Sequence, residues 1–119
     1  MREEIEKYIN ENYNCLQENP WIDSPTFTTF KHKHNKKWFA LFMDIPYKTL
    51  KIEKEGNVSI VNVKNIPEII GGLRKEEGIL PAYHMNKEHW ITILLDETVP
   101  RQKICELIDI SYELTMARK

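Results

Sequence analysis

Two neighbouring segments of strand-like composition, separated by a polar turn, constrain the fold of this chain most. Residues 26–32 (TFTTFKH) are rich in Thr and Phe, and residues 36–43 (KKWFALFM) are more apolar. Aromatic and β-branched residues favour strands. The HKHNKK stretch between the segments is typical of a hairpin turn, in which Asn35 is a residue able to adopt a positive φ. A hairpin requires antiparallel pairing, so we expect an antiparallel sheet.

The remaining segments predict helices placed before, between and after further strands. Apolar residues at helical spacing predict a first helix that ends near Asn19-Pro20. Further elements are expected as strands at 49–53, 58–64, 80–85 and 90–95, a helix at 67–78 and a last helix from Pro100. The fold class is therefore α+β with two layers, in the order α-β-β-β-β-α-β-β-α. An antiparallel sheet of about five to six strands packs against the helices.

Three glycines of the second expected helix are given structural roles. Gly71-Gly72 lies inside the helical pattern and is interpreted as a place where another backbone approaches closely. Gly78 is interpreted as the residue that ends this helix.

Length and composition indicate one soluble domain, residues 1–119. The chain has 119 residues, 41% of them hydrophobic and 29% charged, as in ordinary globular proteins. No apolar run approaches the roughly 18 residues of a membrane span, and no secretory pattern opens the chain. Cys15 and Cys105 show neither a disulfide framework nor a zinc spacing, and both are predicted to be small buried hydrophobes. A cytoplasmic location without membrane association is expected.

Charge is distributed unevenly along the chain. Residues 1–30 hold 2 basic and 6 acidic residues (net −4), residues 31–64 hold 8 and 3 (net +5), and residues 65–119 hold 7 and 9 (net −2). The positive part is densest in Lys31, Lys33, Lys36 and Lys37. Such a patch attracts polyanions. The pI of about 6.4, however, argues against strong, non-specific coating of DNA.

No pattern of catalytic residues is evident. The sequence has neither a Gly-x-Ser-x-Gly elbow nor a Gly-rich phosphate loop followed by Lys-Ser or Lys-Thr. His84 and His89 flank an expected four-residue hairpin tip, where Glu88 could join them around a metal ion. A third protein ligand at a fitting spacing is not evident. We therefore predict no enzymatic activity, no cofactor and no metal site.

Alternation along the first two expected strands assigns side chains to faces. It places Lys31 and Lys33 on one face and His32 and His34 on the other. In the second strand it groups Trp38, Ala40 and Phe42 against Phe39, Leu41 and Met43, and one of these groups must be core. Aromatic rings beside lysines can also stack on nucleic-acid bases. A solvated hairpin end, with lysines that protect a strand edge, remains an equal alternative.

Several segments resemble the MmcQ/YjbR family. The most specific is the run from Pro81 to Trp90 (PAYHMNKEHW), followed by Leu94-Leu95-Asp96 and Val99-Pro100. The segments Trp38–Leu41 (WFAL) and Ile108–Leu114 (IDISYEL) are similar as well. The resemblance covers nearly the whole chain. It departs before the first hairpin, where many members carry a Pro-Phe-Gly segment and this chain has DSPTF.

The resemblance implies a compact α+β fold, likened to CyaY-like or secretion-chaperone-like folds. Members are described as DNA-binding proteins with a double-wing arrangement of β-hairpins, and no catalytic residues come with the family. The functional positions that it implies are Tyr83, His84, Asn86, Lys87, His89 and Trp90. The residues themselves add Lys31, Lys33, Lys36 and Lys37 as phosphate contacts.

The leading hypothesis is a non-enzymatic, cytoplasmic domain that binds DNA weakly and in a salt-sensitive way through two hairpin tips. One alternative is a protein-interaction or chaperone-like adaptor without a nucleic-acid role, which the fold analogy and the acidic N-terminal helix favour. Another is a small-molecule or metal site around Tyr83, His84 and His89, which a deep pocket beside that hairpin would favour. The signature residues can also serve only the turn and the core. A monomer is favoured.

Overall fold

A computed structural model describes residues 1–116 of the chain. Along this part the elements are α1 (Arg2–Asn12), β1 (Cys15–Glu18), β2 (Thr28–His32), β3 (Trp38–Pro46), a 3₁₀ turn η1 (Tyr47–Leu50), β4 (Asn57–Lys64), α2 (Pro67–Leu73), β5 (Ile79–Pro81), β6 (Trp90–Leu94) and α3 (Arg101–Thr115). The predicted order and the α+β class are confirmed. No helix within residues 1–116 is long and apolar enough to cross a membrane.

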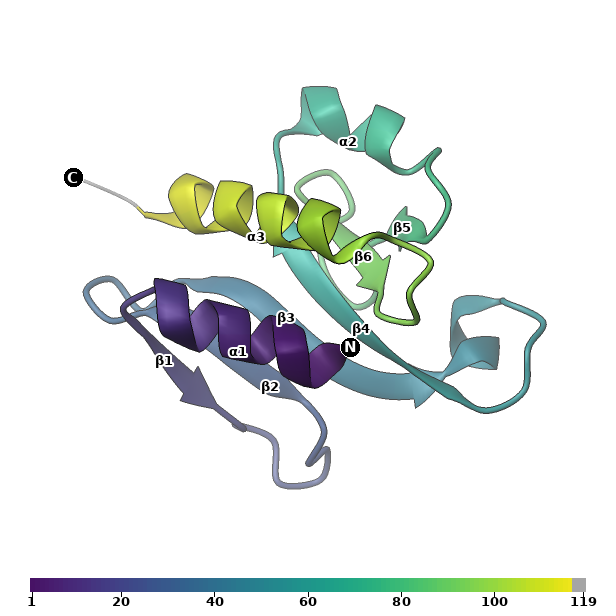
Figure 1. The fold of residues 1–119 in the computed structure, drawn as a ribbon, viewed down its shortest axis with the longest axis horizontal. Helices are drawn as coiled ribbons and strands as arrows, with labels where there is room; N and C mark the ends of the chain where they lie inside the picture. The colour runs from purple at the N-terminus through teal and green to yellow at the C-terminus, as the bar shows by residue number, and fades with distance from the viewer. Residues whose placement is uncertain (117–119) are drawn as a thin grey trace.

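The six strands form one antiparallel sheet in the order β1-β2-β3-β4-β6-β5. Figure 1 shows α1 and α3 on the same face of this sheet, with α2 beyond α3. The main core lies between these helices and the sheet. Fully buried isoleucines of both long helices, Ile5, Ile9, Ile104 and Ile108, pack there against the strands. In each helix the two isoleucines are four residues apart, which places them on one apolar face.

The opposite face of the sheet is also buried, by loops instead of helices. Leu41, Met43 and Ile60 form a second core there. Residues of the connecting segments pack against it, among them Leu50 after β3 and Tyr83 after β5. Burial on both faces explains why β3 is apolar almost throughout instead of alternating.

A β-bulge changes the side-chain facing that alternation predicts for β3. Phe30 pairs with Ala40, but Lys31 pairs with Trp38, so two residues of β3 stand opposite one residue of β2. Phe39 therefore joins Ala40 in the helix-side core, and Trp38 packs against the second core. The predicted faces of Trp38 and Phe39 are therefore exchanged. Side chains on both faces of β3 pack into a core, whereas the alternation required this of only one face.

Two of the expected elements are wrong: one predicted strand is absent, and one strand that was not predicted is present. The total number of strands is therefore unchanged. Residues 49–53, expected as a strand, form the end of η1 and a turn in which Lys51 has a φ of 62°. Residues 15–18, expected as helix, form the edge strand β1. Helix α1 ends earlier because Tyr13 adopts extended backbone angles and stacks on Tyr112, with ring centroids 4.1 Å apart.

Helix α2 is shorter than expected and ends at Leu73. A Cβ at Gly71 or Gly72 would meet nothing within 4 Å, so the predicted close backbone approach is wrong. Gly78 lies beyond the helix in a turn with a φ of +88°, where an added Cβ would stand 2.6 Å from Cγ2 of Val99. Its role is to let the turn before β5 pack against the entry to α3.

Candidate functional site

One end of the sheet brings together segments that are far apart in the sequence. Ala40 pairs with Val63, and Lys64 pairs with Trp90, so β3 begins, β4 ends and β6 begins at the same end. The hairpin of residues 33–37, which joins β2 to β3, lies at this end too. The basic hairpin and the last residue of the signature run therefore belong to one surface.

A shallow hollow of about 350 Å³ lies at this end of the sheet. We call it the sheet-end hollow. It is lined by Lys36, Lys37, Trp38, Lys64, Trp90 and Thr115. Three lysines and two tryptophans line it, and within residues 1–116 no Asp or Glu is among the lining residues. The structure thus joins three predicted residues, Lys36, Lys37 and Trp90, and adds Lys64, which the sequence analysis missed.

The hairpin is held in place by its own polar groups. The left-handed residue is Lys36, with a φ of 62°, and not Asn35. Asn35 instead accepts a hydrogen bond from the backbone N–H of Lys37 (2.9 Å) and donates one to the carbonyl of Thr115 (3.0 Å). The hairpin is thereby tied to the C-terminal end of α3.

The other lysines of the basic stretch are placed differently. Lys31 forms an ion pair with Glu18 on β1, with 3.1 Å between Nζ and the carboxylate oxygen, and its side chain is only 18% exposed. Its charge is therefore largely neutralised, and it does not line the sheet-end hollow. Lys33 is exposed in the turn, where its carbonyl accepts a hydrogen bond from Nζ of Lys36 (3.0 Å).

His32 is fully buried and serves the structure of this region. The hydroxyl of Thr115 donates to the carbonyl of Ser111 (2.8 Å), so it accepts from Nε2 of His32 (2.8 Å). Nδ1 then has no hydrogen-bond partner within residues 1–116. Burial lowers the pKa of His32, and the neighbouring His34 lowers it further. The ring is neutral near pH 7 and contributes no positive charge to the surface.

The segment between β5 and β6 is longer than the predicted four-residue tip. Strand β5 ends at Pro81 and β6 begins at Trp90, so residues 82–89 form the connection. The strand expected at 80–85 is present as β5, but it covers only residues 79–81. Asn86 shapes this connection, since its Oδ1 accepts from the N–H of Glu88 (2.7 Å) and its carbonyl accepts from the N–H of Trp90 (3.0 Å). His89 is exposed.

A second hollow, of about 510 Å³, lies between the end of η1 and this connection. We call it the side hollow. It is lined by Thr49, Leu50, Lys51, Leu80, Pro81, Ala82, Tyr83, His84 and Lys87. It gathers three of the residues implied by the family resemblance, Tyr83, His84 and Lys87. Again no carboxylate is among the lining side chains.

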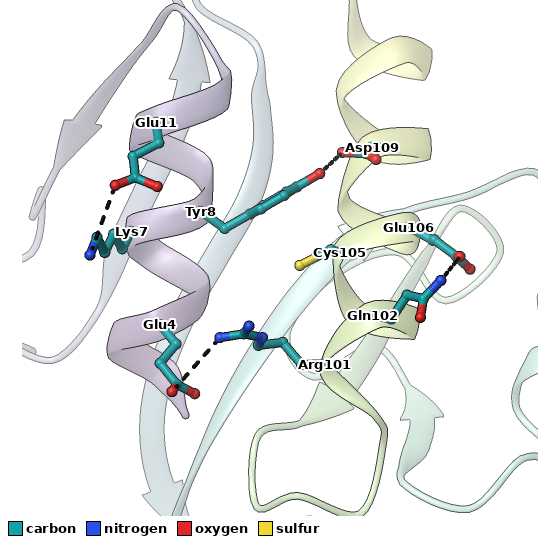
Figure 2. A pocket seen from close by; sticks show the side chains of 9 residues that line it. All are labelled: Glu4, Lys7, Tyr8, Glu11, Arg101, Gln102, Cys105, Glu106 and Asp109. Carbon is teal, nitrogen blue, oxygen red and sulfur yellow. Dashed lines mark hydrogen bonds and ion pairs between the residues drawn. The ribbon is translucent and has the colours of Figure 1, made fainter.

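A third hollow, the largest of those described at about 680 Å³, is a groove between α1 and α3 (Figure 2). Tyr8 donates from its hydroxyl to Asp109 (2.8 Å), and burial together with Asp109 raises the pKa of Tyr8 to about 12. Arg101 pairs with Glu4 across the groove at 3.8 Å. Its polar groups thus largely satisfy one another, which makes it the weaker candidate for a binding site.

The cysteines and histidines offer no metal centre in residues 1–116, where no group of three His, Cys, Asp or Glu side chains is close enough to hold an ion. Cys15 and Cys105 are free and pack against the helix-side core, but they are half-buried and not fully buried as predicted. Burial raises the pKa of both thiols, so they stay protonated near pH 7.

Comparison with known proteins gives similarities along nearly the whole chain. The model of the YjbR family matches residues 11–114. The uncharacterized protein YyaQ of Bacillus subtilis is 42% identical over 96% of this chain and 97% of its own length. The uncharacterized protein YjbR of Escherichia coli K12 is 35% identical over 52% of this chain and 53% of its own length.

Solved structures of similar proteins share the fold. A crystal structure of a Pseudomonas syringae protein superimposes with a TM-score of 0.93 at 42% identity, covering 97% of this chain and 98% of that one. A crystal structure of a Deinococcus radiodurans protein with the domain DUF419 gives a TM-score of 0.74 at 28% identity, covering 96% and 77%. The names of these relatives state no activity, so the chemistry of the site has to be argued from this chain.

Proposed function

The chain belongs to the YjbR family, and on that premise we propose that it is a non-enzymatic, cytoplasmic domain that binds nucleic acid at the sheet-end hollow. The observation that carries the proposal is the gathering of Lys36, Lys37 and Lys64 beside Trp38 and Trp90, with no Asp or Glu of residues 1–116 in the lining. A positive groove with aromatic rings is the arrangement by which proteins hold a nucleic-acid backbone and stack on its bases.

The lysines supply the affinity in this proposal. Ammonium groups contact phosphates and release counterions, which makes binding weaker as salt rises. With Lys31 neutralised by Glu18, three contacts from Lys36, Lys37 and Lys64 are expected in place of four. Three contacts correspond to a slope of about −2.7 for log K against log salt on duplex DNA.

The segment 82–89 supplies the second contact surface, because it leads directly into Trp90 at the edge of the hollow. Lys87 and His89 are exposed on it. The carbonyl of the Asn86 side chain is used within the turn, which leaves its amide N–H groups as the donors for a base edge or a phosphate. The hairpin of residues 33–37 and this segment then act as the two wings.

The test is a fluorescence-anisotropy titration with labelled duplex and single-stranded DNA at about 50 and 200 mM salt. The site variant carries Lys36→Ala, Lys37→Ala and Lys64→Ala. The control carries Lys7→Ala, Lys48→Ala and Lys75→Ala, which remove the same charge from exposed positions outside the hollow. We expect the site variant to lose the salt-dependent binding and the control to keep it. No binding by the wild type at low salt, or equal loss in both variants, contradicts the proposal.

A protein-interaction adaptor is the second candidate, because α2 and α3 carry exposed apolar side chains. Ile69 is 47% exposed and Ile110 is 43% exposed, with Ile66 and Leu114 close to these values. Contiguous apolar surface of this kind marks sites of interaction with other proteins. A protein partner that is lost on Ile69→Lys and Ile110→Lys, and kept by the lysine variant of the sheet-end hollow, would favour this function.

A further inference from the structure

The side hollow has the size and lining of a small-molecule site. Its volume of about 510 Å³ falls within the range of roughly 300–1,000 Å³ that ligand pockets occupy. Leu50, Leu80 and Ala82 give it apolar surface. Lys51 comes from the end of η1, and Lys87 comes from the segment after β5. The hollow therefore combines an apolar body with positive charge from two separate parts of the chain.

Two aromatic rings stand together at the side hollow. The ring centroids of Tyr83 and His84 are 4.0 Å apart, with 58° between their planes. Tyr83 is half-buried, packs against the second core and also lines the hollow. A flat ring of a ligand finds here the aromatic surface on which such rings stack.

The backbone of Tyr83 is fixed by a buried polar pair. Asn62 of β4 donates from Nδ2 to the carbonyl of Tyr83 (2.9 Å). Oγ1 of Thr92 on β6 accepts from the backbone N–H of Tyr83 (2.9 Å). The hydroxyl of Thr92 donates in turn to Oδ1 of Asn62 (2.5 Å), and both side chains are fully buried. Buried polar groups are costly unless they are satisfied. These two are satisfied by holding the start of the connection in place, which pre-organises a site there.

Left-handed backbone is concentrated around the two hollows. The non-glycine residues with positive φ in residues 1–116 are Lys36, Lys51, His84 and Glu97. Lys51 and His84 both line the side hollow, and Lys36 lines the sheet-end hollow. Such strained positions cluster at binding sites, where the backbone aims a side chain that an ordinary conformation would turn elsewhere.

We propose that the side hollow binds a small aromatic anion. A flat ring lies against Tyr83 and His84, and its phosphate or carboxylate lies between Lys51 and Lys87. The site goes beyond the proposed nucleic-acid interface: it shares Lys87 and its neighbours with the segment 82–89 of that interface, but it shares no lining residue with the sheet-end hollow. An uncharged ring leaves the lysines unused, and a bare anion leaves the rings unused, so the two halves of the ligand are required together.

The test is a two-dimensional amide NMR titration of the full chain. Adenosine 5′-monophosphate and indole-3-acetate are the phosphate and carboxylate probes, and adenosine and inorganic phosphate are the half-ligand controls. We expect saturable shifts for at least one probe at amides of residues 49–51 and 80–87, with much weaker effects from both half-ligands. No saturable shift there from either probe up to about 10 mM, or equal binding of a half-ligand, overturns the proposal.

Matched variants complete the experiment. Lys51→Gln with Lys87→Gln removes both charges from the hollow and is expected to weaken binding at least tenfold. Lys48→Gln with Lys75→Gln makes the same charge change outside the hollow and is expected to leave binding unchanged. Wild-type affinity in the Lys51/Lys87 variant also overturns the proposal. The DNA titration replaces Lys36, Lys37 and Lys64 and keeps Lys51 and Lys87, whereas this titration does the reverse, so each proposal fails on its own variant.

Discussion

Ser111 joins three elements through one buried hydroxyl. Its Oγ donates to the carbonyl of Phe39 (2.6 Å) and accepts from the backbone N–H of Lys64 (2.9 Å). The bulge in β3 and the end of β4 are thereby fixed to α3 at the position where the sheet-end hollow lies. A single polar residue of the helix core thus positions the backbone from which Lys64 extends.

His32 is expected to make stability depend on pH. The unfolded chain takes up a proton at about pH 6.5, whereas the folded chain does so only at lower pH because burial lowers the pKa of His32. The unfolded state therefore binds more protons below pH 6.5, and the free energy of unfolding falls there by up to about 1.4 kcal/mol per pH unit. Urea denaturation between pH 7.5 and 5 should show this decline, and His32→Gln should reduce it.

The control for His32→Gln is the same substitution at an exposed histidine. His89 is exposed on the segment after β5, so His89→Gln is expected to keep the wild-type decline. The groups around His32 are His34 on the hairpin and Tyr112 and Glu113 on α3, and they are unchanged in both variants. The same pH dependence in wild type and His32→Gln would show that the buried ring does not set the decline.

At the scale of elements, local signals decided which predictions were correct. Helix α3 follows Pro100 and keeps a regular apolar face, and β3 and β4 are long apolar runs, so each carries its own signal. The edge strand Cys15–Glu18 carries none, because its strand character comes from pairing with β2. Residues 49–53 alternate like a strand, which explains the prediction, but in the structure they pair with no strand of the sheet.

The candidate site was predictable only in part for a related reason. The basic hairpin and the signature run are visible in the sequence, but their joining depends on β4 lying between β3 and β6. That strand order also places Lys64 opposite Trp90, and no local pattern marks Lys64 as a site residue. The pairing of Lys31 with Glu18 required β1, which was missed.

Two glycines test how tightly the elements pack. Gly56 and Gly78 have nearly the same φ, +86° and +88°, but only Gly78 has close neighbours, at Val99 and Thr98. Gly56→Ala is expected to lose about 1 kcal/mol of unfolding free energy through backbone strain alone. Gly78→Ala is expected to lose about 1–3 kcal/mol more, because its Cβ overpacks the entry to α3. Urea denaturation of both variants measures the difference, and equal losses would mean that this contact relaxes freely.

For the molecule as a whole, the two faces of the sheet have different coverings. Helices close one face, and connecting segments close the other. Leu50 and Tyr83 pack against the second core and also line the side hollow, so the segments that complete the core are those that form the proposed binding surface. Loops placed on a rigid sheet in this way are where proteins commonly carry function.

The helical layer is tied to the far part of the sheet at Arg2. Its guanidinium donates to Asp44 of β3 (2.7 Å), to the carbonyl of Thr26 (2.7 Å) and to the hydroxyl of Thr28 (3.0 Å), and the side chain is only 16% exposed. It also lies over the ring of Phe42, 5.5 Å from the centroid. These contacts join the first turn of α1 to β2 and β3.

Arg2→Met is therefore expected to lower the free energy of unfolding by about 1–2 kcal/mol, a value moderated by the partial exposure of Asp44 to water. Amide hydrogen exchange should increase first in α1, because the helix loses its tie to the sheet. Arg101→Met is the control, since its pair with Glu4 spans 3.8 Å and both side chains are about 60% exposed. The Arg101→Met variant should lose no more than about 0.5 kcal/mol of unfolding free energy. If both variants lose the same amount and α1 keeps its protection, the apolar face of α1 alone docks the helix, and the Arg2 contacts are incidental to the arrangement of the two layers.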